Sequence, residues 1–74
     1  MASHRVMVTL DIDPSSGMAL RLERVARRLS AREVAEAVGV SRQRVYEWER
    51  RARPPDTARK RYLSAVAQLD TARR

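Results

Sequence analysis

One segment near the middle of the chain constrains the fold most, because two helix starts and one helix stop follow one another there. Ser30 and Glu33 are spaced as a capping box, in which each side chain bonds a free backbone N–H at the start of a helix. Gly39 suits the left-handed conformation that ends a helix, and Ser41 suits the cap of the next one. The segment therefore predicts a short helix over residues 31–38, a tight turn and a second helix.

Apolar residues around this turn have the three- and four-residue spacing of helices that bury one face. The first helix is expected to bury Val34, Ala35 and Val38. The second helix, over about 42–51, is expected to bury Val45, Trp48 and Ala52. Its outward residues are polar or aromatic: Arg42, Gln43, Arg44, Tyr46, Glu47 and Arg50.

Two further helices are predicted on either side of this pair. A helix over about 15–28 has an apolar stripe that is expected to face the core: Met18, Leu22, Val25, Ala26 and Leu29. Asp56 follows two prolines and is expected to cap a helix over about 57–71. The inward stripe of that helix is Ala58, Tyr62, Ala65, Val66 and Leu69.

Residues 5–12 alternate strictly between apolar and polar side chains, which is the pattern of a β-strand. The apolar set is Val6, Val8, Leu10 and Ile12. Because a lone strand cannot satisfy its own backbone groups, we expect it to pair with the same strand of a second copy in an antiparallel ribbon. An arm that is disordered or packed on a helix is the alternative. On this interpretation residues 1–13 form a dimerisation arm and residues 14–74 form the main domain.

Composition excludes several classes of protein. A chain of 74 residues holds one small domain. It has no Cys and one His, His4, so we expect no disulfide framework, no metal site and no cofactor. No apolar run approaches the ~20 residues of a membrane span, and we expect a cytoplasmic protein. Paired carboxylates and a Gly-rich phosphate loop are absent from the sequence, and Ser41 has no His in reach, so an enzyme is not expected.

Basic residues are numerous and concentrated in one part of the chain. Sixteen Lys and Arg stand against nine Asp and Glu, a formal net charge of +7. Residues 42–61 alone hold eight bases and three acids. Fifteen of the sixteen bases are Arg, whose planar fork matches phosphate and guanine. This band predicts a polyanionic partner.

Two helices joined by a short glycine turn can hold the second helix where its outer face enters a DNA major groove. Residues 20–69 resemble the Cro/CI-type (Xre-like) helix-turn-helix family of phage and bacterial repressors. The residues that carry the resemblance are Leu29-Ser30, Val34-Ala35, Gly39-Val40-Ser41, Val45, Trp48-Glu49, Pro54, Tyr62-Leu63 and Leu69. The resemblance implies a mainly α, four-helix, lambda-repressor-like domain that binds double-stranded DNA and is usually dimeric.

The resemblance and the side-chain chemistry together predict the DNA contacts. Base contacts are expected from Arg42, Gln43, Arg44 and Glu47. DNA backbone contacts are expected from Arg32, Ser41, Tyr46, Arg50, Arg51 and Arg53. Glu47 has the alternative of bridging a neighbouring arginine, and Tyr46 that of a plain surface ring. The resemblance also implies a structural ion pair between Glu49 and Arg24.

The leading interpretation is a transcriptional repressor, associated with the nucleoid, that binds a palindromic operator as a homodimer with helix 42–51 in the major groove. Two alternatives remain. The N-terminal ribbon itself resembles the DNA reader of ribbon-helix-helix proteins, or the strand serves an antitoxin- or anti-repressor-like interaction module by joining another protein's sheet. Substitutions at Arg42 and Gln43, compared with Arg5 and Thr9, separate the two DNA-reading hypotheses.

Overall fold

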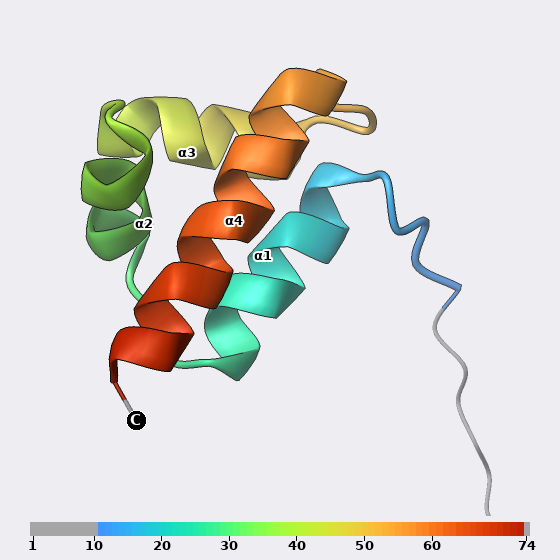
Figure 1. The fold of residues 1–74 in the computed structure, drawn as a ribbon. Coiled ribbons are helices and arrows are strands. Elements are labelled where there is room, and N and C mark those ends of the chain that lie inside the picture. The colour runs from blue at the N-terminus through green and yellow to red at the C-terminus, as the bar shows by residue number, and fades with distance from the viewer. Residues whose placement is uncertain (1–10, 74) are drawn as a thin grey trace, which may run out of the picture.

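The computed structural model describes residues 11–73 of the protein, and this part of the chain forms four α-helices (Figure 1). They are α1 (Gly17–Ala26), α2 (Ala31–Val38), α3 (Arg42–Arg50) and α4 (Asp56–Ala72). All four predicted helices are confirmed, and their ends lie within two residues of the predicted ends. The mainly α, four-helix class is therefore confirmed.

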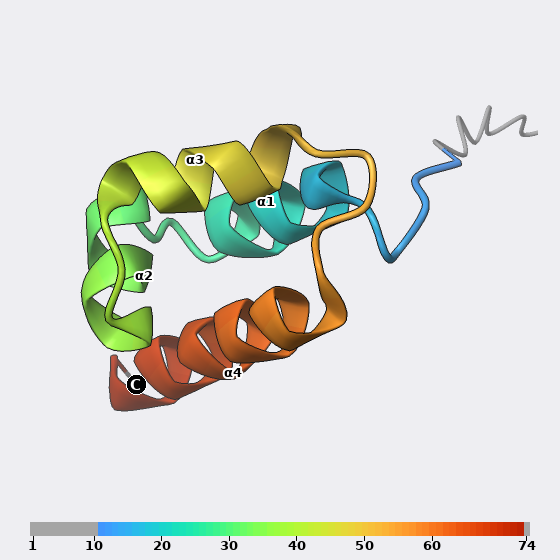
Figure 2. The same ribbon diagram turned by 90° about the horizontal axis from the view of Figure 1, so that it is seen from above.

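The predicted N-terminal strand is not supported. No residue in the range 11–73 lies in a strand, and Ile12, the last residue of the predicted segment, is in irregular structure. Val6, Val8 and Leu10 lie outside the described residues. In both ribbon views the described residues before α1 lead away from the helices (Figures 1 and 2). A strand needs a neighbouring strand to satisfy its backbone N–H and C=O groups. Residues 11–73 of one chain contain no such strand for Ile12 to pair with.

The helices enclose one aliphatic core. α2 packs on α3 and α4, and α1 packs on the same two helices. Figure 2 shows α3 and α4 on opposite sides of the molecule, with α2 closing one end. The buried apolar residues are Leu20, Leu29, Ala31, Val34, Ala35, Val38, Val45, Trp48, Ala58, Tyr62, Ala65 and Val66. The inward residues predicted for α2 and α4 are all among them, except Leu69, which is half-buried against the core.

Local capping signals determine most of the helix ends. The Ser30 hydroxyl accepts from the Glu33 backbone N–H at 3.0 Å, and the Glu33 carboxylate accepts from the Ser30 N–H at 2.8 Å, so the capping box is confirmed. Gly39 ends α2 with φ 88°, and Ser41 caps α3. The cap predicted for α4 was wrong, because Asp56 is the first residue of the helix and the cap position is held by Pro55. Pro55 has no side-chain group that could accept from the first N–H groups of α4, and the helix begins without a side-chain cap.

The predicted orientation of α1 was wrong. Met18, Leu22 and Val25 are 48%, 43% and 48% exposed, whereas Leu20 and Arg24 are buried. Ala26 is exposed too, and Leu29 is the member of the predicted stripe that is buried as expected. The spacing of apolar residues left Arg24 out of the stripe that was expected to face the core, whereas Arg24 is buried. Its guanidinium is instead bound inside the protein by a carboxylate of α3, and this pair turns the apolar stripe of α1 outward.

A smaller correction concerns Ala52, which was expected to be buried at the end of the second helix. α3 ends at Arg50, and Ala52 is exposed in the loop that follows. The turn before α1 lies beside this loop, since the Gly17 N–H donates to the Arg51 carbonyl at 2.9 Å. The loop therefore ties the end of α3 to the start of α1.

Candidate nucleic-acid interface

The turn between α2 and α3 is rigid because it combines a glycine conformation with buried packing. The N–H groups of Gly39 and Val40 both donate to the Ala35 carbonyl, at 2.8 and 3.0 Å. Val34 on α2 and Val45 on α3 are completely buried beside the turn. Because these contacts fix both ends of the turn, the angle between the two helices is set by the core and the outer side of α3 is left free.

A buried polar network holds α3 from behind. Arg24 of α1 donates to both carboxylate oxygens of Glu49, at 2.7 Å from Nε and 3.0 Å from Nη2. This confirms the ion pair that the resemblance implied. A third Arg24 nitrogen, Nη1, donates to the Leu29 carbonyl at 3.1 Å. The guanidinium therefore connects α1, the start of α2 and α3 at one point.

Tyr62 of α4 is a third member of this network that the sequence did not predict. Its hydroxyl donates to Glu49 Oε2 at 2.6 Å, and its side chain is completely buried. Burial, followed by the hydrogen bond to the Glu49 carboxylate, raises the pKa of the Tyr62 hydroxyl far above its usual range. The hydroxyl therefore stays a donor. Its inward position was predicted, and the signal that was missed is that a buried tyrosine hydroxyl needs a partner.

The outward side of α3 presents a polar stripe. Gln43, Glu47 and Arg50 are spaced by four and three residues, so they share one face of the helix. This face lies opposite the buried Val45, Trp48 and Glu49. All three stripe residues are exposed, and each carries a group that can bond a base edge or a phosphate. We call Gln43, Glu47 and Arg50 the α3 stripe.

Further polar residues flank the α3 stripe. Arg42 and Tyr46 lie on one side of it and Arg44 on the other, and all three are exposed. Arg44 Nη1 lies 3.8 Å from Glu47 Oε1, a loose pair between two side chains that are 59% and 49% exposed. Such a pair in water contributes little to stability, so both groups are available to a ligand. The four predicted base-contact residues are thus brought together on one exposed surface.

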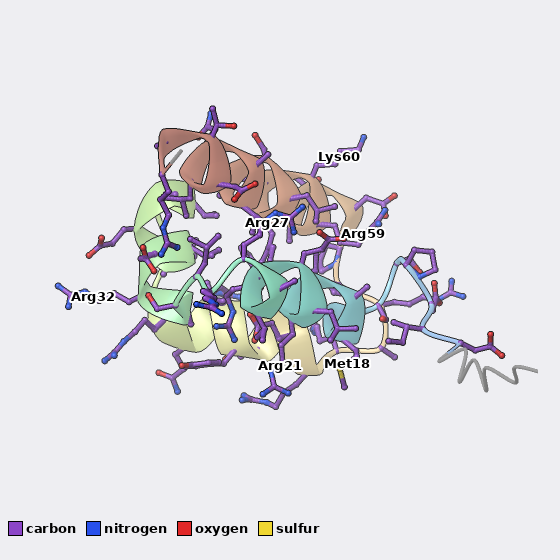
Figure 3. The ribbon with its side chains drawn as sticks, turned by 90° about the horizontal axis from the view of Figure 1, so that it is seen from below. Met18, Arg21, Arg27, Arg32, Arg59 and Lys60 are labelled. Atoms are coloured by element: carbon purple, nitrogen blue, oxygen red, sulfur yellow. The ribbon has the colours of Figure 1, made fainter. Side chains whose placement is uncertain are left out.

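The residues predicted to contact the DNA backbone are spread over α2, α3 and the segments on either side of α3. Arg32 projects from the α2 end of the molecule (Figure 3) and makes only an exposed pair with Glu36, at 3.3 Å. The Ser41 hydroxyl accepts from the Arg44 N–H at 3.1 Å as the cap of α3, which leaves its own proton free for a phosphate. Tyr46 and Arg50 are on α3 itself, and Arg51 follows it.

Arg53 lies in the loop between α3 and α4. Backbone and side-chain hydrogen bonds from Ser15 lower the pKa of the Asp13 carboxyl, and the charges of Arg53 and Arg59 lower this pKa further. The Arg53 side chain is exposed.

A groove of about 770 Å³ between α1 and α3 is lined by Arg21, a residue that the sequence did not predict for the site. Met18 and Arg21 of α1 line it together with Tyr46, Arg50 and Arg51. Figure 3 shows Met18 and Arg21 on the side of α1 that faces away from α4. Arg21 thus joins the basic surface, although its distance in sequence from α3 gave no signal of this.

The described residues contain no group of three or more His, Asp or Glu side chains that could hold a metal ion. None of the four helices in this part of the chain is long and apolar enough to cross a membrane. The exposed surface of α3 carries guanidinium, amide and carboxylate groups and is the candidate site.

Comparison with protein families shows what the chain is similar to. The model of a family described as helix-turn-helix matches residues 20–59, which is more than half of the chain and includes α2, α3 and the turn between them. No curated protein and no solved structure matches the chain. The protein therefore belongs to the Xre/Cro-like helix-turn-helix family of DNA-binding transcription regulators.

Proposed function

We propose that the protein is a sequence-specific repressor that binds a palindromic operator as a homodimer, with α3 in the major groove of each half-site. The observation that carries this proposal is the division of α3 into two faces. Val45, Trp48 and Glu49 anchor one face in the core, and the α3 stripe projects from the other. A rigid helix with a free polar face is the geometry that reads base edges. On this proposal the protein acts on the nucleoid.

The residues of this surface match the donors and acceptors of bases. The Gln43 amide can form two hydrogen bonds with adenine, and the guanidinium of Arg42 or Arg44 can form two with guanine. Glu47 can accept from the amino group of cytosine. A carboxylate among arginines repels phosphate, so it contributes to binding only where a base donor faces it. We therefore assign Glu47 a role in selecting sequence.

Contacts to the DNA backbone come from the residues around α3 on this proposal. They are Arg32, Ser41, Tyr46, Arg50, Arg51 and Arg53. Arg32 at the start of α2 also lies where the backbone N–H groups of a helix favour a phosphate. These contacts fix the position of the helix on the duplex without reading sequence.

Dimerisation is proposed through the N-terminal segment, whose alternating residues Val6, Val8, Leu10 and Ile12 would pair with those of a second copy. Two copies related by a two-fold axis would present their α3 helices to half-sites about 34 Å apart, one turn of DNA. A dimer bound across a promoter blocks polymerase, which is the basis for proposing a repressor.

Selection of bound duplexes from a random library tests this function. The expected result is enrichment of one sequence with two-fold symmetry and half-sites separated by about 10 base pairs. A reporter gene placed under a promoter that contains the selected site should lose expression when the protein is present. Failure to enrich any sequence at low salt would overturn the proposal, and enrichment of a site without symmetry would overturn its dimeric part.

A further inference from the structure

The groove between α1 and α3 is lined by one row of side chains from each helix. The α1 row consists of Met18, Arg21 and Arg24, and the α3 row contains Tyr46 and Glu49. Residues three apart lie on one side of a helix, so each row faces the groove along its length. We call this space the α1–α3 groove. Its volume of about 770 Å³ is large enough to hold part of another molecule.

The charges around the α1–α3 groove are not balanced. Arg24 and Glu49 neutralise each other through their hydrogen bonds of 2.7 and 3.0 Å. Arg21, Arg50 and Arg51 also line the groove, and none of them forms an ion pair with an acidic side chain of residues 11–73. Their like charges repel one another, and an anion between them would offset that repulsion. The groove therefore suits an anionic occupant.

Arg21 has no acidic partner on its own helix. Arg27 on the same helix pairs with Glu23 at 2.6 Å, four residues away. The positions three and four residues from Arg21 hold Gly17, Met18, Arg24 and Val25. Because these are the positions that a helical side chain can reach, α1 offers the Arg21 guanidinium no carboxylate. The Arg21 side chain is exposed and is available to an anion from outside the protein.

We propose that the α1–α3 groove holds part of the sugar-phosphate backbone of bound DNA, and that Arg21 binds one phosphate there. The inference rests on the DNA-binding function proposed above and adds a contact from α1 to it. Tyr46 and Arg50 belong both to the groove and to the exposed surface of α3. A helix in a major groove has a phosphate strand on either side of it. The strand on the α1 side of α3 would then follow the α1–α3 groove.

The apolar residues of the α1–α3 groove fit the same occupant. Met18 is 48% exposed and Tyr46 is 44% exposed, and both lie among the arginines that line the groove. A DNA strand alternates phosphates with deoxyribose rings, so its sugar carbons can cover these side chains while a phosphate binds Arg21. A small inorganic anion would neutralise the arginines and leave both apolar surfaces in water. The DNA backbone is therefore the occupant that uses both parts of the groove.

Duplexes in which one phosphate is replaced by an uncharged methylphosphonate test this contact. The affinity of the full-length protein for the selected operator, with one replacement at a time, is measured by fluorescence anisotropy. In the wild-type protein, replacement of each contacted phosphate should weaken binding. Arg21→Gln should bind the unmodified operator about 10-fold less tightly. It should also stop responding to replacement at one position for each bound copy. That position should be the same as, or next to, the one that Arg50→Gln loses.

The matched control is Arg28→Gln, because Arg28 is an exposed arginine beyond the other end of α1. It should respond to every replacement as the wild-type protein does. Met18→Glu places a negative charge in the same groove and should weaken binding to all duplexes by repelling the phosphate. A wild-type pattern of responses in Arg21→Gln, an equal loss in Arg28→Gln, or unchanged affinity of Met18→Glu would overturn the proposal.

A salt series on a random duplex separates this inference from the proposed function. Arg21→Gln should reduce the slope of log affinity against log salt by about one for each bound copy, whether or not the protein selects a sequence. If the wild-type protein selects an operator and Arg21→Gln keeps the wild-type slope, the α1 contact alone is overturned. If the wild-type protein selects no sequence but Arg21→Gln lowers the slope, the α1 contact is supported and the sequence-specific function is overturned.

Discussion

At the scale of single residues, Glu49 has the largest structural role of any acidic side chain in the described residues. It accepts from Arg24 through both carboxylate oxygens and from the Tyr62 hydroxyl, and so joins α1, α3 and α4. Only 4% of its side chain and 11% of that of Arg24 are exposed. Removal of one partner from such a pair leaves the other charge buried without compensation.

Glu49→Ala should therefore lower the free energy of unfolding by about 3–5 kcal/mol, because Arg24 would keep its charge inside the protein. Urea denaturation monitored by circular dichroism measures this loss. The matched control is Glu36→Ala, whose pair with Arg32 is exposed and should change stability by less than about 1 kcal/mol. Similar effects of the two substitutions would contradict the structural role of Glu49.

Glu33 provides a test of pH dependence. Hydrogen bonds from the Ser30 backbone and side chain lower the pKa of the Glu33 carboxyl, with a smaller contribution from the charge of Arg73. Its pKa is then lower in the folded protein than in the unfolded chain. The stabilisation is fully present above the unfolded pKa and is lost as the pH falls through the folded one.

The stability difference between the wild-type protein and Glu33→Gln should accordingly shrink as the pH falls below the ordinary glutamate pKa. Glutamine keeps the size and an acceptor of the capping box but carries no charge to titrate. Urea midpoints of both proteins across acid pH measure the difference. A difference that stays constant or grows with acid would show that the Glu33 pKa is not lowered.

At the scale of the elements, two glycines have different reasons for being glycine. A side chain at Gly17 would collide with the Trp48 and Glu49 carbonyl oxygens, because α1 starts directly against the end of α3. A side chain at Gly39 would meet nothing within 4 Å, but the residue has φ +88°. The first position is restricted by packing and the second by backbone conformation.

Gly17→Ala should therefore destabilise the protein more than Gly39→Ala. The first forces α1 away from α3 and should lower the free energy of unfolding by about 3 kcal/mol or more. The second costs about 1–2 kcal/mol for the left-handed conformation alone. Thermal unfolding of the two variants shows which of them loses more stability. A larger loss in Gly39→Ala would contradict the close approach of α1 to α3.

The sequence predicts those features of the helices that depend on neighbouring residues, and it does not predict those that depend on distant ones. The helices and the caps at Ser30 and Ser41 were predicted because their signals lie within a few residues of each other. The orientation of α1 was predicted wrongly from its apolar spacing. That spacing left out the pair between Arg24 and Glu49, 25 residues away, which only the family resemblance implied. For the site, the outward residues of α3 followed from helical spacing. Arg21 and Tyr62 join through tertiary packing, which local patterns do not encode.

At the scale of the whole molecule, charge determines how the protein meets DNA. The net charge is +7, and the proposed backbone contacts include four arginines in each copy: Arg32, Arg50, Arg51 and Arg53. A dimer with about 6–10 phosphate contacts should lose roughly 10³–10⁵-fold in affinity between 50 and 200 mM salt, because bound counterions are released from the DNA.

Arg51→Gln should weaken binding to all duplexes alike and reduce the slope of log affinity against log salt by about two in the dimer. The control is Arg27→Gln, which removes the same charge from a side chain between α1 and α4 that pairs with Glu23 (Figure 3). Fluorescence anisotropy over a salt series measures both slopes. Equal slopes in the two variants would contradict a phosphate contact at Arg51.

The central claim is that the outward face of α3 reads bases, and a comparison of two glutamines tests it most directly. Gln43 is in the α3 stripe, and Gln68 is exposed on α4. The affinities of Gln43→Ala and Gln68→Ala for the selected operator and for a scrambled duplex should be measured at one salt concentration. We expect Gln43→Ala to lose about 10–100-fold on the operator alone, and Gln68→Ala to bind both duplexes as the wild-type protein does. Equal operator affinity of the two variants would contradict the claim.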